Sequence, residues 1–261
     1  MPDMLRQILR ERSRAVARAR RQVPLRTLLL EASRRTPCSL VDRLRLSPAP
    51  RIIAEIKRAS PAAGPLRPEL TPATLAEEYA AAGAVALSVL TEPTHFGGSE
   101  TDLRAVRSAV NLPILRKDFI LDSYQLAETA AWGADVVLLI AAALPPRRCR
   151  ALYEEARALG LETIVEVHRE EELPAALACA EAIIGVNRRD LRTLTLDPGV
   201  PRRLAYRLPT ERLRIAASGV TTAAEVAELH ALGYHAVLVG ATLLRSPQPG
   251  RALRALREAP S

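Results

Sequence analysis

A regular alternation of strand-like and helix-like segments is the feature that most constrains the fold of this chain. From residue 51 onward, short β-branched runs are followed by helical patterns. Runs such as VVLLI and AIIGV are continuously apolar, which is typical of parallel strands covered on both faces. The pattern predicts eight strands, at residues 51–57, 84–90, 113–117, 135–140, 162–167, 182–187, 214–217 and 236–240.

Helices fit between these strands, and several have recognisable ends. Thr71 followed by Pro72 is an N-cap with proline at the first helical position. Thr222 with Glu225 three residues later resembles a capping box. Glycine, which readily takes the left-handed conformation that ends many helices, follows four of the patterns, at positions 83, 133, 160 and 233. The predicted helices span residues 71–82, 100–110, 123–132, 146–159, 170–179, 198–206, 222–232 and 249–256.

Eight strand–helix units in succession predict an α/β protein, a closed (β/α)8 TIM barrel. A doubly wound open sheet is the alternative. It calls for a glycine-rich phosphate loop after the first strand, and the segment KRASPAAGPL has no such fingerprint. We expect one domain overall, with residues 51–261 as the catalytic barrel and residues 1–50 as an N-terminal helical extension packed on it.

The net charge of +8 is confined to that extension. Residues 1–50 hold 12 arginines and four acidic residues, whereas the remainder is neutral. Leu5, Ile8, Leu9 and Val16 recur near helical spacing, which favours an amphipathic helix packed on the domain. No aromatic residue stands among those arginines to stack on bases, so we expect no nucleic-acid partner. Polyanion binding through the arginine-rich N-terminus remains the alternative.

Cysteine usage and hydropathy indicate the compartment. The three cysteines, Cys38, Cys149 and Cys179, are widely spaced and lack metal-ligand spacing. The chain has no apolar run of membrane-spanning length, and its start lacks the apolar stretch of a secretory signal. We therefore expect a reduced cytoplasmic protein without a disulfide framework, a metal site or a membrane partner.

Lysine is rare in this chain, and its two positions point to an active site. Lys57 and Lys117 are the only lysines among 37 basic residues. Arginine stays charged, whereas lysine can lose its proton when its pKa is shifted. Both lysines fall at the ends of predicted strands, where barrels of this type carry their active sites. A structural ion pair between Lys57 and Glu55 is the alternative interpretation for Lys57.

Other polar or small residues end the remaining strands. Glu166 lies in the fifth strand, and Asn187 with Arg189 ends the sixth. Two pairs of small residues follow the seventh and eighth strands, where this fold often binds phosphate through open backbone N–H groups. These pairs are Ser218-Gly219 and Gly240-Ala241; turns that merely need glycine are the alternative.

The segments IIAEIKRASP, LTEPTHFGGS, PILRKDFI, IVEV, IIGVNRRDL, ASGV and VLVG occur in that order. Together with ILRERSRAVARAR near the N-terminus, they resemble the indole-3-glycerol-phosphate synthase family over nearly the whole chain. The resemblance implies a carboxy-lyase of tryptophan biosynthesis. Its substrate is 1-(2-carboxyphenylamino)-1-deoxyribulose 5-phosphate, which undergoes ring closure, decarboxylation and dehydration to indole-3-glycerol phosphate. No metal or organic cofactor is implied, and we expect a monomer or weak homodimer.

The resemblance also implies roles for individual residues. Lys117 matches the lysine of the family's KDF motif and is the candidate general acid of ring closure. Glu166 is the candidate base of dehydration, with Lys57 or Lys117 as the acid and Glu55 holding Lys57. The remaining residues are predicted to contact substrate, namely Ser60, Phe119, Asn187 and Arg189, or its phosphate, namely Ser218, Gly219, Gly240 and Ala241.

The chain departs from the family pattern at the seventh strand. Ala217 stands where the family usually has glutamate, which predicts one acid–base or orienting group fewer. A family member with altered substrate or reduced activity is therefore an alternative. A related phosphate-binding barrel isomerase is another, although those carry Asp or Cys where this chain has Glu55 and Lys57.

Overall fold

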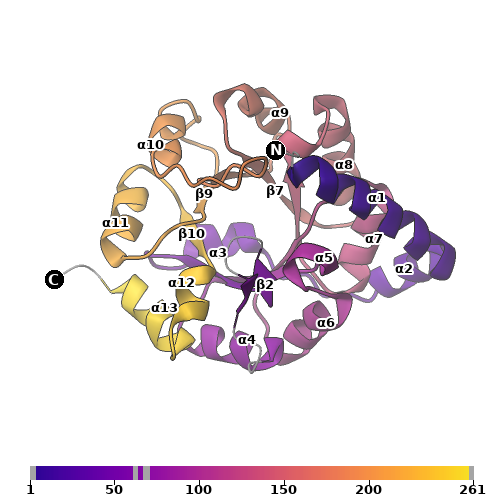
Figure 1. Ribbon diagram of the computed structural model, residues 1–261, viewed down its shortest axis with the longest axis horizontal. Helices are drawn as coiled ribbons and strands as arrows, with labels where there is room; N and C mark the ends of the chain where they lie inside the picture. The colour runs from indigo at the N-terminus through magenta and orange to yellow at the C-terminus, as the bar shows by residue number, and fades with distance from the viewer. Residues whose placement is uncertain (1–3, 61–63, 67–70, 259–261) are drawn as a thin grey trace.

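The strands of the barrel match the prediction. The computed structural model describes residues 4–60, 64–66 and 71–258. Its parallel strands are β1 Ile52–Ile56, β4 Ala86–Leu90, β5 Ile114–Lys117, β6 Val136–Ile140, β7 Glu162–Val167, β8 Ile183–Asn187, β9 Arg214–Ala217 and β10 Ala236–Val239. They close into a barrel in the order β1-β10-β9-β8-β7-β6-β5-β4, which confirms the predicted fold. Figure 1 views the barrel nearly end-on, with the helices forming an outer ring.

The outer helices follow the predicted segments. They are α4 Pro72–Ala81, α6 Glu100–Ala109, α7 Ser123–Ala131, α8 Pro146–Ala158, α9 Leu173–Leu177, α10 Val200–Ala205, α11 Ala223–Ala231 and α13 Pro249–Arg257. The Thr71 side chain accepts a hydrogen bond from the amide of Thr74, and Thr222 with Glu225 forms the predicted capping box. The four glycines that follow helices all have positive φ, which confirms their role at helix ends.

The structure differs from the prediction at two helices and in several loops. The segment 170–179 is divided into a 3-10 turn, Glu170–Glu172, and α9, because Pro174 lacks an amide and stands in the first turn of α9. The helix expected at 198–206 is shortened to α10, which has Pro201 in its first turn. Short elements that the periodicity did not reveal follow the strands: β2 Ala59–Ser60, β3 Gly64–Pro65, α5 Pro93–Phe96, a 3-10 turn at Ala141–Ala143 and α12 Ala241–Arg245.

Alternation along the strands separates the protein interior into two layers. On β1, Ile52 and Ala54 pack with the helices, whereas Ile53 joins the cluster inside the barrel. The same alternation turns Leu115, Ile164 and other residues of the remaining strands inward. Inward-facing positions nearer the carboxyl ends of the same strands carry polar side chains. These side chains are therefore directed to the mouth of the barrel.

Three N-terminal helices pack against the barrel. α1 Met4–Gln22 and α2 Leu25–Ala32 lie against α7 (Figure 1), where the Tyr124 hydroxyl donates to the carbonyls of Ala19 and Val23. α3 Leu40–Leu46 buries Leu40 and Leu44 in the cluster inside the barrel. The assignment of residues 1–50 and 51–261 to a single domain remains a prediction. No helix in the described part of the chain is long and apolar enough to cross a membrane.

Candidate active site

A cavity of about 280 Å³ opens at the carboxyl ends of the strands. The loops after β1, β4, β5, β8, β9 and β10 contribute its wall, which is where this fold carries its active sites. Eleven of the twelve predicted site residues line the cavity, namely Glu55, Lys57, Ser60, Lys117, Phe119, Asn187, Arg189, Ser218, Gly219, Gly240 and Ala241. Glu166 instead borders an adjoining smaller recess and reaches the cavity through its contact with Lys117.

Glu55 and Lys57 form an ion pair inside the cavity. The Lys57 ammonium lies 2.5 Å from Oε1 of Glu55, and both side chains are largely buried. Burial raises the pKa of Glu55, but the charges of Lys57 and Lys117, a hydrogen bond from Lys57 and the charge of Arg189 outweigh it and leave that pKa below its usual value. The Lys57–Glu55 ion pair, the alternative to a catalytic role for Lys57, is therefore present and lies within the site itself. It fixes Lys57 at the barrel mouth.

Gly240 is needed because Glu55 packs against it. A Cβ atom at position 240 would lie 2.5 Å from Oε1 of Glu55, too close for packed atoms, and 3.0 Å from its Cβ, which is a tight contact. The loop after β10 thus supports the carboxylate that holds Lys57. This contact gives Gly240 a structural function beside the predicted phosphate contact.

Lys117 and Glu166 form the second lysine–carboxylate pair. The Lys117 ammonium lies 3.5 Å from Oε2 of Glu166, across β6 from β5 to β7. Burial lowers the pKa of Lys117, but the charges of Glu166 and Glu55 and a hydrogen bond to Glu166 outweigh it, so that pKa is raised. Lys117 is therefore held as a cation, in the protonated state that a general acid requires.

Asn187 and Arg189 begin the loop that follows β8. The side-chain oxygen of Asn187 accepts the amide of Arg189 at 2.9 Å, and the guanidinium of Arg189 donates to the carbonyl of Leu194 at 2.8 Å. Leu194 has φ of +61°, a strained conformation for a leucine. No sequence pattern pointed to this loop as part of the site, although its leucines Leu191, Leu194 and Leu196 line the cavity.

The predicted phosphate residues come together at one side of the cavity. Ser218 and Gly219 are both left-handed, with φ of +71° and +72°. The hydroxyl of Thr242 donates to the carbonyl of Val220 at 2.6 Å and ties the loop after β9 to α12. The first turn of a helix leaves backbone N–H groups without intrahelical acceptors. The short helix α12, which begins at Ala241, was not predicted and brings its first turn to the cavity.

The remaining wall of the cavity is apolar and partly aromatic. Phe96 and Phe119 line it with ring centroids 6.4 Å apart. Ala217 also lines it and is 4% exposed, so the position carries no polar side chain toward the cavity. The other apolar lining residues include Leu90, Leu138, Ile140 and Leu238.

The charges at the site favour an anionic ligand. Lys57 and Lys117 are paired with Glu55 and Glu166, whereas Asp118, which also lines the cavity, is paired with Arg12 and Arg116 and leaves Arg189 unmatched by these carboxylates. Arg245, which sequence analysis did not single out, adds a fourth cation at the end of α12. Among the residues that the structure describes, no group of three or more His, Cys, Asp and Glu is arranged to hold a metal ion.

Several N-terminal arginines bind acidic groups of the barrel rather than standing free. Arg12 contacts Asp118, Arg20 contacts Asp122, and Arg35 contacts Asp135. Arg35 also donates to the carbonyls of Ala134 and Gly160. These three side chains are engaged within the protein, which favours packing over polyanion binding as their function.

Comparison with known proteins adds independent evidence. A family model described as indole-3-glycerol phosphate synthase matches residues 5–256. A protein of that name from Kineococcus radiotolerans is 51% identical over 203 residues, which are 78% of this chain and 74% of that protein. Another from Rhodopirellula baltica is 44% identical over 254 residues, or 97% of this chain and 98% of that protein. The solved tryptophan synthase subunit alpha of Legionella pneumophila aligns with a TM-score of 0.59 at 18% identity, covering 83% of this chain and 95% of that chain, a likeness of fold alone.

Proposed function

The chain belongs to the indole-3-glycerol phosphate synthase family, and on that premise we propose that it converts 1-(2-carboxyphenylamino)-1-deoxyribulose 5-phosphate to indole-3-glycerol phosphate. The aromatic carbon that bears the carboxylate attacks the ketone carbon, and the carboxylate leaves as CO₂. The hydroxyl group that the ketone becomes is then lost with a ring proton as water. One observation carries the proposal: two lysine–carboxylate pairs meet at the mouth of a barrel whose cavity has excess positive charge.

Lys117 is the proposed general acid of ring closure. Its ammonium would donate a proton to the ketone oxygen as the carbon–carbon bond forms, and Glu166 keeps it charged for that purpose. After decarboxylation, Glu166 is the proposed base that removes the ring proton, and Lys57 or Lys117 donates the proton that the departing hydroxyl needs. Acid–base groups of this kind contribute about 10²–10⁴-fold each.

The other lining residues are proposed to bind and orient the substrate. Arg189 suits the carboxylate, because a guanidinium can donate two parallel hydrogen bonds, and Asn187 and Ser60 contribute further polar contacts. Phe119 suits the face of the aromatic ring. The phosphate is assigned to backbone N–H groups of the small residues at 218–219 and 240–241. The left-handed turn at Ser218 and Gly219 and the first turn of α12 support this assignment.

We further propose that the protein acts in the cytoplasm on this small phosphorylated molecule, as a monomer or weak homodimer and without a nucleic-acid, membrane, metal or cofactor requirement. The direct test incubates purified, EDTA-treated protein with the carboxyphenylamino-deoxyribulose phosphate and follows indole fluorescence together with released CO₂. Equal amounts of both products are expected. A folded protein that forms no indole at high enzyme concentration would refute the proposal.

A further inference from the structure

Arg12 interrupts the buried stripe of the first helix. Leu5, Ile8, Arg12 and Val16 are the buried residues of α1, and the side chain of Arg12 is only 9% exposed. A charge removed from water in this way must be paired to be tolerated. An arginine at the central position of an otherwise apolar stripe therefore indicates a specific partner on the barrel.

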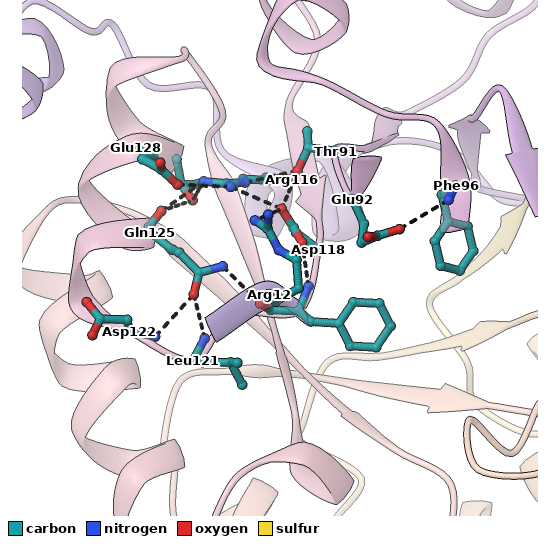
Figure 2. Close-up of polar contacts among 12 residues, drawn as sticks. Arg12, Thr91, Glu92, Phe96, Arg116, Asp118, Leu121, Asp122, Gln125 and Glu128 are labelled. Atoms are coloured by element: carbon teal, nitrogen blue, oxygen red, sulfur yellow. Dashed lines mark hydrogen bonds and ion pairs between the residues drawn. The ribbon is translucent and has the colours of Figure 1, made fainter. Parts of the chain in front are cut away.

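That partner is Asp118, the residue that follows the candidate acid Lys117. Figure 2 shows Arg12, Thr91 and Arg116 converging on Asp118. The Asp118 Oδ2 atom accepts from the Arg12 guanidinium at 2.7 Å, from the Thr91 hydroxyl at 2.7 Å and from Arg116 at 3.0 Å. Its Oδ1 atom accepts the amide of Phe119 at 2.8 Å. Both carboxylate oxygens of a fully buried side chain are thus satisfied.

Arg116, the residue before Lys117, is also held by several buried contacts. Its buried guanidinium contacts Glu128 at 3.1 Å, donates to the carbonyl of Gln125 at 3.0 Å and lies 3.9 Å from the ring centre of Trp132. Two arginines, Arg12 and Arg116, thereby balance two carboxylates, Asp118 and Glu128. Loss of Arg12 would leave this buried cluster with an unbalanced negative charge.

The residues before and after Lys117 are therefore both held in a buried polar cluster at the cavity wall, which Asp118 helps to line, and α1 supplies one of the four charges of this cluster. The contact between the Lys117 ammonium and Glu166 is 3.5 Å, at the outer limit of a hydrogen bond, so a shift of this segment that lengthened it would break that bond. We propose that Arg12 is a positioning residue that, through Asp118, holds the backbone of β5 so that the Lys117 ammonium faces Glu166 and the substrate. This inference rests on the proposed function.

The neighbouring residue of α1 holds a second loop of the cavity. Glu11 contacts His95 at 2.8 Å, and the next residue, Phe96, lines the cavity opposite Phe119. Consecutive residues of α1 thus contact the loops after β4 and β5, which carry both phenylalanines of the wall. The first helix is part of the support of the active site and not only a cover for the barrel.

The test compares Arg12→Met with Arg18→Met, which removes an exposed arginine from the same helix. For Arg12→Met we expect kcat to fall about 10- to 100-fold with KM changed by less than about threefold, since a misplaced catalytic group costs rate more than binding. The alkaline limb of the kcat–pH profile should move to lower pH, because Lys117 would lose part of its contact with Glu166. Arg12→Lys should recover part of kcat, and Arg18→Met should match the wild type.

A double-mutant cycle with Asp118→Asn shows whether Arg12 acts through Asp118. We expect Arg12→Met to add little further loss of kcat in that background. A kcat within about twofold of wild type in folded Arg12→Met, an equal loss in Arg18→Met, or fully additive losses in the cycle would each overturn the inference. Should Arg12→Met not fold, Asp118→Asn alone must reproduce the loss of kcat and the pH shift. Wild-type turnover, measured in parallel, separates failure of this inference from failure of the proposed function.

Discussion

The ammonium of Lys117 lies 3.5 Å from the carboxylate of Glu166, so the candidate acid of one step and the candidate base of another form a single ion pair across the barrel mouth. The charge of Glu166 raises the pKa of Lys117 and keeps the ammonium protonated. The two residues are therefore best tested both individually and as a pair.

Replacement of Lys117 by arginine separates charge from proton transfer. Arginine keeps the positive charge beside Glu166 but does not give up a proton at accessible pH. We expect kcat for Lys117→Arg to fall about 10²–10⁴-fold. Indole fluorescence under saturating substrate measures this, and circular dichroism checks the fold. Turnover within a few-fold of wild type would remove Lys117 from the role of acid.

The rarity of lysine allows the pKa of Lys117 to be observed directly. Protein labelled with ¹⁵N-lysine should give only two Nζ signals, because the chain has two lysines. We expect the Lys117 signal to titrate above the ordinary lysine pKa and to move down in Glu166→Gln, because Glu166 is the main charge that raises it. The corresponding contribution to stability is fully present below pH about 10.4 and is lost as pH rises through the folded-state pKa. A Lys117 signal that titrates below 10 in the wild type would contradict this assignment.

Gly240 should not tolerate a methyl group. In Gly240→Ala the new Cβ would displace Glu55, and Lys57 would lose its fixed position. We expect kcat/KM to fall by about tenfold or more. Gly199→Ala is the matched control, since its nearest neighbour is the mobile end of Arg203. Equal activity of the two variants would show that the cavity adapts around position 240.

Ala217 is the natural site for a gain of activity. Ala217→Glu would place a carboxylate beside the end of β8, at an inward position of β9 in a cavity whose cations outnumber its carboxylates. If Ala217 has simply removed the acid–base group that the family's glutamate provides, we expect kcat of Ala217→Glu to rise by up to about tenfold. Steady-state kinetics on the unsubstituted substrate measures the change. An unchanged or lower kcat would instead indicate a cavity adapted to alanine.

Arg35 provides a test of the single-domain organisation. It donates to the carbonyls of Ala134 and Gly160 and pairs with the buried Asp135. We expect Arg35→Met to lower the free energy of unfolding by about 2 kcal/mol, because buried acceptors lose a charged donor. Arg34→Met, which alters an exposed neighbour, should change it by less than about 0.5 kcal/mol. Two separate unfolding transitions in the wild type would contradict a single domain.

Much of the fold and site was predictable from local patterns. Apolar runs located all eight strands, and capping residues and glycines located the helix ends, because these signals depend on neighbours in sequence. The alternation along β1 correctly put Glu55 and Lys57 on one face. Short helices such as α5 and α12 span little more than one helical turn, so no helical period appears in them and Arg245 was missed. The loop leucines Leu191, Leu194 and Leu196 lie outside any helix or strand, where no periodic pattern is expected.

The sequence by itself therefore determined the barrel, the strand ends that meet at its mouth and the two lysines among them. Only the tertiary structure decided the partners. Lys117 and Glu166 are 49 residues apart, and Arg12 and Asp118 are 106 apart. No periodicity relates such positions, because their contact depends on how the strands close and how α1 packs on the closed barrel. In the sequence, Arg12 is one of several arginines in a basic segment. Only the folded barrel shows the buried carboxylate of Asp118 that it binds.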